Sequence, residues 1–459
     1  MQKTIIFTKR ETKNSSISDL YSKVSKLNEN SGELKNSSIS VVPLFILLYA
    51  TMILTGITET AKAITLPAIK ANFGISYLET GNLVSMTTFA YVGVCFFASI
   101  YMKKIGIKYA LFTGFLILLT GFLLNLIALS YGMVTIAIMV LTSSFGMFEV
   151  GNNALAMKLF TKRTALLFSF MHFFYGFGAI MGPYFAVWVL SIPFVAAKGV
   201  SAWRYIYVFL SVLPVILIII LFSAKFNGNS NSSKPSELND SESKNESFKQ
   251  TDENMDYNTL SKKLTVPQIL KMPAMWFFSI VLGLLVAVEL SPVNWGPLYF
   301  QDIYGLPPET DGARFVSVFY LFFTGSRLFF GFVIEKIGYY RSLIICIILS
   351  IGLLTLGFSL GPNGITIIPI SGLFISQFWI LIVSIANKRF KEEAGMISAI
   401  IITVVGLIIA LTQILVGYIN EISNGIWGFR FSIIFASLAL CLVILGKKIL
   451  LGSAHDFKN

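Results

Sequence analysis

Residues 146–183, GMFEVGNNALAMKLFTKRTALLFSFMHFFYGFGAIMGP, decide the fold: two long apolar runs meet at a short basic turn. Each run carries one ionisable side chain, Glu149 before the turn and His172 after it. In a helical hairpin both would lie roughly 16 Å from the turn, at a rise of about 1.5 Å per residue. Ionisable groups at that depth of a bilayer are costly and usually mark an ion or substrate pathway. We therefore interpret the pair as proton-coupling groups; the alternative is a structural pair that only locks the hairpin.

The composition indicates a membrane protein. The 459 residues have a mean hydropathy of +0.76, with 55% hydrophobic and only 13% charged residues. A soluble protein would carry about a quarter charged residues. Apolar runs with internal Gly and Pro favour a helical bundle in the lipid bilayer over a β-barrel. The three cysteines fall inside apolar runs, which predicts packing roles and no disulfides: Cys95, Cys346 and Cys441.

The net charge of +12 follows the topology. If apolar runs are spans that alternate in direction, 28 Lys and Arg fall on the side of the N-terminal tail and five on the other. Two more, Lys62 and Arg327, lie inside spans. The positive-inside rule then places both termini in the cytoplasm of a multi-pass protein of the plasma (cell inner) membrane. The basic balance therefore predicts no nucleic-acid partner.

The apolar runs fall into two sets of six, which predicts an all-α membrane protein with twelve transmembrane helices in two six-helix bundles. Between the sets lies a polar, Ser- and Asn-rich segment that cannot bury a core. The predicted division is as follows: a disordered cytoplasmic tail at 1–40, an N-terminal bundle at 41–224, a cytoplasmic linker at 225–265, a C-terminal bundle at 266–450 and a cytoplasmic tail at 451–459.

The two sets also resemble each other. Three landmarks recur in order at nearly one offset: Glu59 and Pro67 as Glu289 and Pro297 (230), KIG at 104–106 as KIG at 336–338 (232), and FTKRTA at 160–165 as FKEEAG at 390–395 (230). Such repeats predict two parallel halves, the plan of transporters that rock around a site near the membrane midplane.

Polar side chains inside the first set are candidate substrate ligands. Asn152 and Asn153 follow Glu149 by one turn, so at least one should face the same interior and could bind substrate hydroxyls. Glu59 and Lys62 are three residues apart on one helical face. They either neutralise each other or contact substrate.

The second set adds Glu289, which has no cation nearby in sequence, followed by Asn294 and Trp295. Pro292 and Pro297 are expected to interrupt this helix and free backbone groups to line a cavity. Trp295 either stacks on a sugar ring or belongs to an aromatic belt.

Arg327 is the only Arg inside a span, and we expect it to gate the cytoplasmic end, with substrate binding as the alternative. The sequence has no P-loop, nucleophile elbow or metal-spaced His/Cys cluster. We therefore predict no enzyme, no cofactor and no metal site.

These features resemble the major facilitator superfamily. Its loop signature is matched by Gly331, Glu335, Lys336, Gly338 and Arg341, whereas the first half has MKKIGIK, with Lys103 in place of the acid. More specifically, the chain resembles the fucose:proton symporter family. The residues that carry this resemblance are the MKK loop, Glu149 with Asn153, the run HFFYGFGAIMGP, and Glu289 with Trp295.

The resemblance implies a sugar symporter that works by alternating access, in which Glu149 matches a carboxylate linked to substrate and proton. Such symporters can carry another acid just before a Leu-Pro in the first span. Here Ala63 stands at that position beside Lys62. This departure leaves the proton stoichiometry open, and a buried Lys62 would favour an anionic substrate.

The predicted function is secondary active uptake of a monosaccharide or similar small polar solute with protons, by a monomer. The alternatives are an efflux transporter of drugs or metabolites, an organic-anion carrier, and a transporter-like sensor that binds solute without moving it.

Overall fold

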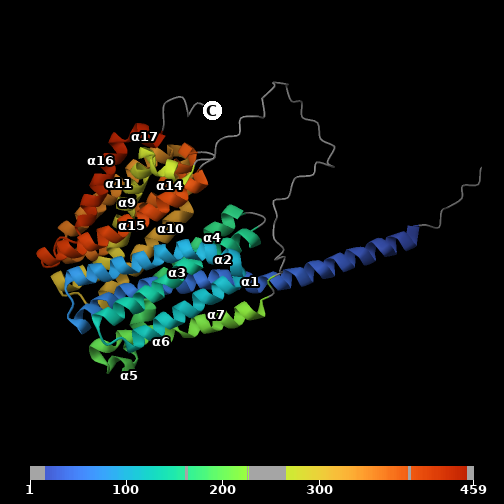
Figure 1. Cartoon of the computed structure of the whole chain (residues 1–459), viewed down its shortest axis with the longest axis horizontal. Helices are drawn as coiled ribbons and strands as arrows, with labels where there is room; N and C mark the ends of the chain where they lie inside the picture. The colour runs from blue at the N-terminus through green and yellow to red at the C-terminus, as the bar shows by residue number, and fades with distance from the viewer. Residues whose placement is uncertain (1–15, 161–163, 225, 227–264, 391–393, 452–459) are drawn as a thin grey trace, which may run out of the picture.

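The computed structural model describes residues 16–160, 164–224, 226, 265–390 and 394–451, and every element in these residues is a helix. Figure 1 shows them gathered into two bundles. The first bundle contains α1 (Ser16–Phe73), α2 (Tyr77–Ile127), α3 (Tyr131–Leu159), α4 (Thr164–Ser191), α5 (Pro193–Ala196), η1 (Gly199–Ser201), α6 (Trp203–Leu210) and α7 (Val212–Ser223). The second begins with α8 (Val266–Leu270), α9 (Pro273–Tyr304), η2 (Pro308–Gly312), α10 (Ala313–Ile337) and α11 (Tyr339–Ser359). It continues with η3 (Gly361–Asn363), α12 (Gly364–Ile367), η4 (Ile368–Ser371), α13 (Gly372–Ile375), α14 (Gln377–Phe390), α15 (Ala394–Ile422), α16 (Phe431–Leu445) and α17 (Lys447–Leu451).

The described residues contain ten helices that are long and apolar enough to cross a membrane. Helix α2 has 51 residues and turns at Gly106, whose φ of 80° and ψ of 167° are not helical. It therefore provides two crossings, and the 15 residues of α16 provide one more. Together these segments give the twelve crossings predicted from hydropathy, and the all-α membrane fold is confirmed.

Two details differ from the sequence prediction. Helix α1 begins at Ser16, well before the predicted start of the first span at residue 41. Helix α9 runs unbroken through Pro292 and Pro297, so these prolines do not interrupt it. Apart from a few flanking residues, the predicted linker at 225–265 and the tail at 451–459 lie outside the described residues.

Each bundle has its own hydrophobic core. The first is built around Trp203, Tyr207 and Phe115, and the second around Trp295 and Phe319. Corresponding helices begin at nearly the offset seen in the sequence. For example, α4 and α15 begin 230 residues apart, and the spans of α1 (Val42–Phe73) and α9 (Pro273–Tyr304) begin 231 residues apart. The repeated motifs thus mark equivalent helices of two similar bundles.

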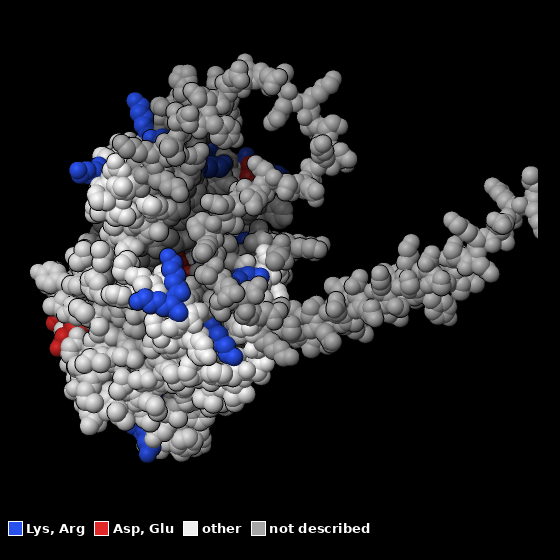
Figure 2. Space-filling view, turned by 45° about the vertical axis from the view of Figure 1, so that its right-hand side comes forward, with Lys and Arg blue, Asp and Glu red and all other residues white. Residues whose placement is uncertain are grey.

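The bundles touch mainly along two antiparallel helix pairs, α2 with α15 and α4 with α10, and α1 also contacts α9. We call the face where α7 ends and α8 begins the linker side, and the opposite face the far side. In the first pair the backbones cross closely, because a Cβ on Gly81 would lie 2.8 Å from the Cα of Gly417. Several hydrogen bonds and one ion pair join the bundles between the far side and mid-height. Figure 2 shows a hollow between the bundles, with basic side chains on its rim. The molecule is therefore closed on the far side and open on the linker side.

Candidate functional site

Ionisable groups from both bundles meet at mid-height. Glu59 on α1 and Glu289 on α9 occupy equivalent positions of the two halves. The charge of each acts on the same two tyrosine hydroxyls, Tyr175 of α4 and Tyr320 of α10. These hydroxyls also interact with each other across the boundary between the bundles. Four helices thus bring two acids and two hydroxyls to one place between the halves.

Glu59 and Lys62 neutralise each other. The Lys62 Nζ lies 2.9 Å from the Glu59 Oε1, and the lysine is only 8% exposed. The spacing of three residues on one helix makes this contact local. Of the two predictions for this pair, mutual neutralisation is the one seen in this conformation.

Glu149 lies on α3 among polar groups of its own bundle. Its Oε1 accepts a hydrogen bond of 3.0 Å from the Nδ2 of Asn153. Its charge also acts on Tyr91 and Cys95 of α2. Asn152 is completely buried, and neither its Oδ1 nor its Nδ2 has a hydrogen-bond partner among the described residues. Asn153, and not Asn152, therefore shares the polar environment of Glu149.

The predicted pairing of Glu149 with His172 is not formed. Helix α3 packs along α2, whereas α4 packs along α1 and, across the boundary, along α10. The two residues lie at similar depths, but their helices do not form a packed hairpin. His172 is exposed, and the charge that acts on it is that of Arg327 in the other bundle.

Glu289, Asn294 and Trp295 lie on α9, but they do not all face one open space. The Trp295 indole is 1% exposed, and its Nε1 donates a hydrogen bond of 2.8 Å to the Oε1 of Gln413 on α15. Asn294 is likewise buried. In this conformation the indole therefore packs in the second bundle, away from an aromatic belt at the surface. Of the three residues, Glu289 is the one whose charge acts on the Tyr175 and Tyr320 hydroxyls between the bundles.

Arg327 lies about ten residues before the linker-side end of α10, with its guanidinium 4.5 Å from the ring centre of Phe323. The rest of the predicted loop signature surrounds the end of this helix. Gly331, Glu335, Lys336 and Arg341 are exposed there. Gly338 ends the helix with a φ of 88°, close to the 80° of Gly106 in the first half. This backbone conformation favours glycine, which explains why the KIG motif recurs in both halves.

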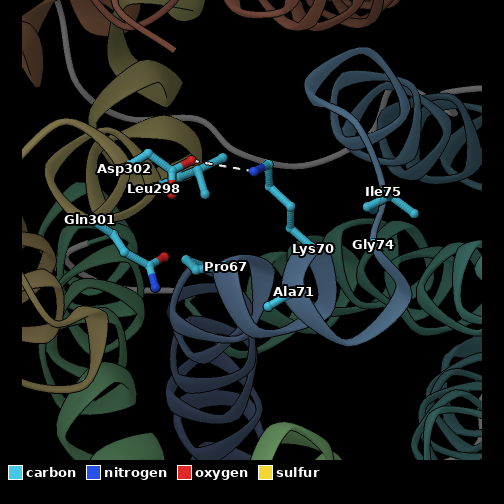
Figure 3. Close-up of a pocket in the computed structure, with 8 residues that line it drawn as sticks. All are labelled: Pro67, Lys70, Ala71, Gly74, Ile75, Leu298, Gln301 and Asp302. Carbon is cyan, nitrogen blue, oxygen red and sulfur yellow. Dashed lines mark hydrogen bonds and ion pairs between the residues drawn. The ribbon is translucent and has the colours of Figure 1, made fainter. Parts of the chain in front are cut away.

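The far side is closed by polar contacts that sequence reasoning missed. The Tyr77 hydroxyl donates a 2.7 Å hydrogen bond to the Oδ2 of Asp302, and the Lys70 Nζ lies 3.4 Å from the same oxygen. Glu421 accepts a 2.8 Å bond from the backbone N–H of Tyr77. A cavity of about 340 Å³ adjoins this closure, lined in part by Pro67 and the side chains drawn in Figure 3. Lys70 and Asp302 lie 232 residues apart, so the repeat offset was the signal that could have found them.

Other residues that the sequence did not single out are Tyr175, Tyr320 and Gln413. Tyr175 stands three residues after His172, which places both on one helical face, and this spacing could have identified it. Tyr320 and Gln413 gave no such local signal, because their partners lie on other helices.

Comparison with known proteins places this arrangement in a family. Residues 48–412 match the family described as Major Facilitator Superfamily. A search of curated proteins found no match. Among solved structures, a bacterial homologue of the human lysosomal transporter Spinster, in an inward-facing and unoccupied conformation, is similar with a TM-score of 0.68 and 12% identity, covering 89% of this chain and 97% of the other.

Two further solved structures share the fold. The nucleoside transporter NupG has a TM-score of 0.67 at 14% identity, covering 89% of this chain and 99% of the other. The Escherichia coli fucose:proton symporter FucP has a TM-score of 0.57 at 16% identity, covering 90% of this chain and 99% of the other. With a family match over most of its length and this two-bundle architecture, the chain belongs to the Major Facilitator Superfamily and is a transporter rather than an enzyme.

Proposed function

We propose that this protein is a secondary active transporter that takes up a small polar solute, a monosaccharide or a close relative, together with protons. The supporting observation is the cluster of ionisable side chains at mid-height, where the two bundles separate. Keeping such groups within the membrane is costly, and they usually serve a transported ion or solute. One structural neighbour is a fucose:proton symporter, which is consistent with this class of cargo.

Glu149 is the proposed proton carrier. It is half-buried on α3, and Asn153 is its only hydrogen-bond partner among the described residues. Protonation would remove a charge from the membrane interior, and it shifts the conformational equilibrium only if the two conformations differ in proton affinity. His172 is a second proton-coupling candidate, which acts beside Arg327 rather than beside Glu149.

The proposed topology follows the distribution of Lys and Arg. The linker side, which includes both termini, faces the cytoplasm of the plasma membrane. The proposed units are the two bundles at 41–224 and 266–450, working as one monomer. The structure then corresponds to the state that is open to the cytoplasm.

The test is solute uptake into proteoliposomes under an imposed pH gradient. With an imposed gradient of about one pH unit, we expect Glu149→Gln to lower gradient-driven accumulation about tenfold, because one coupled proton then supplies about 1.4 kcal/mol. Counterflow exchange of the same solute should persist, because exchange needs no net proton movement. The control is Glu309→Gln, which removes an exposed carboxylate on the far side. If the Glu149 variant still accumulated solute as the wild type does, the coupling role of Glu149 would be wrong.

A further inference from the structure

Helices α4 and α10 pack antiparallel across the boundary between the bundles. We call their contacts at successive turns a ladder, and each contact a rung. On the far-side part of the ladder, the Ser317 hydroxyl donates a 2.8 Å hydrogen bond to the carbonyl oxygen of Ile180. Nearer the linker side, Gly176 packs directly on Thr324, so that any side chain at Gly176 would collide with the threonine side chain. Residue numbers decrease along α4 in the direction in which they increase along α10. The two contacts therefore fix which residues of the two helices face each other.

One further turn along this ladder pairs His172 with Arg327. His172 precedes Gly176 by four residues, and Arg327 follows Thr324 by three, so both keep the facing side of their helices. The charge of Arg327 acts on His172 across the boundary. Beyond this rung, Gly331 continues the same face of α10; it is exposed, and a Cβ there would meet nothing within 4 Å. The rung therefore lies where the bundles begin to separate, at the inner end of the hollow.

Arg327 has unused hydrogen-bonding capacity. Its Nε is buried, and among the described residues it has neither a hydrogen-bond partner nor a carboxylate within 4.0 Å of the guanidinium. The Thr324 Oγ1, one turn away, is also buried without a partner. Buried polar groups are normally hydrogen-bonded, and an unpaired guanidinium is especially costly. Two adjacent unsatisfied groups beside an imidazole are what a bound anion would need.

The other charges near mid-height do not fill this role. Lys62 is already paired with Glu59 at 2.9 Å, so its charge is not available to a solute. The charge of Glu289 attracts Arg327, but the two form no ion pair within 4.0 Å. Arg327, and not Lys62, is therefore the cation that could hold an anionic solute.

We propose that Arg327, Thr324 and His172 bind the anionic group of the transported solute, a carboxylate or a phosphate on a small hydroxylated molecule such as a sugar acid or a sugar phosphate. This proposal rests on the transport function proposed above and narrows its substrate class. A guanidinium presents paired N–H donors that match both anions. Donors on α4 of the first bundle and α10 of the second would then contact the same anion. Solute binding would thereby depend on the relative position of the two bundles.

The experiment measures binding to the purified full-length protein by calorimetry, with matched sugars that differ in the anionic group. The probes are galactose against galacturonate, and glucose against glucose 6-phosphate. Hydrogen bonds to charged groups predict that the anionic member binds about 10- to 100-fold more tightly to the wild type. The galacturonate and glucose 6-phosphate arms separate a carboxylate from a phosphate cargo.

Variants assign the effect to the site. Arg327→Gln should abolish the preference for the anionic sugar, Arg327→Lys should keep part of it, and Thr324→Val should weaken it about three- to tenfold. The matched control is Arg314→Gln, which removes an exposed arginine from the far-side end of the same helix and should leave the preference intact. Thr324→Val preserves volume, so it keeps the test valid if Arg327→Gln does not fold.

Three outcomes would overturn the proposal: equal affinity for neutral and anionic sugars, an unchanged preference in both Arg327→Gln and Thr324→Val, or no binding of either anionic probe. Binding is measured without transport, so the two proposals can fail separately. Selective binding of an anionic sugar without proton-driven uptake would refute proton-coupled transport while supporting this site. Proton-driven uptake of a neutral sugar, without binding of an anionic sugar, would support proton-coupled transport and refute this site.

Discussion

The far-side and linker-side ends of the two bundles are held in different ways. On the far side, Asp302 and Glu421 of the second bundle accept hydrogen bonds from the first, and glycines of α2 and α15 bring the backbones into contact. On the linker side, a Cβ at Gly331 of α10 would meet nothing within 4 Å, so no neighbouring helix packs against this position. The difference teaches that the present state is stabilised by the contacts of its closed end. Weakening those contacts should therefore favour the opposite state.

The largest effect is expected from Gly81→Ala. The added Cβ would lie 2.7 Å from the carbonyl oxygen of Gln413, and backbone atoms cannot yield as a flexible side chain would. A packing conflict costs about 1–3 kcal/mol, which would shift the equilibrium towards far-side opening by about 5- to 150-fold. Spin labels at Lys198→Cys and Leu360→Cys, both on the far side, should report a larger separation between the bundles.

The control for this variant is Gly93→Ala on the same helix, where an added Cβ meets nothing within 4 Å. It should leave the label distances unchanged. If the two alanine variants gave the same distance distribution, close glycine packing would not be what keeps the far side closed.

A smaller effect is expected from Asp302→Ala. The change removes the acceptor for the Tyr77 hydroxyl and the partner of Lys70. Solvent weakens contacts at this surface, so we expect a loss of about 0.5–1.5 kcal/mol and a shift of about two- to tenfold. The same spin-label pair measures it, with Glu309→Ala as the control because that exposed carboxylate forms no ion pair with the described residues. A shift no larger than that of the control would exclude Asp302 from the closure.

Gly338→Ala on the linker side should leave the equilibrium between the two states unchanged. Its φ of 88° is unfavourable for alanine, so the free energy of unfolding should fall by about 1 kcal/mol. Gly331→Ala lies within helix α10 with nothing within 4 Å of its Cβ, and should be neutral or stabilising. Unfolding in detergent measures both, and a change in the spin-label distances would show that this turn also affects closure.

The sequence predicted the features that depend on local pattern. Hydropathy identified the twelve crossings, the offset near 230 identified equivalent helices, and a spacing of three residues predicted the contact between Glu59 and Lys62. Features that depend on which helices pack together were not predictable in this way. Glu149 and His172 are close in sequence and similar in depth, yet their helices have different neighbours. The bond from Trp295 to Gln413 spans 118 residues and had no local signal.

The contact between Lys70 and Asp302 has no counterpart in the other half. In this pair of helices the repeat offset is 230, so Lys70 corresponds to Phe300 and Asp302 to Asn72. An exact twofold arrangement of the bundles would place a second contact between Asn72 and Phe300, and an amide and a phenyl ring cannot form an ion pair. The Asn72 Oδ1 instead accepts hydrogen bonds within its own bundle. The outer end is therefore fastened on one side of the pseudo-twofold axis, and loss of one carboxylate leaves no second ion pair among the described residues to replace it.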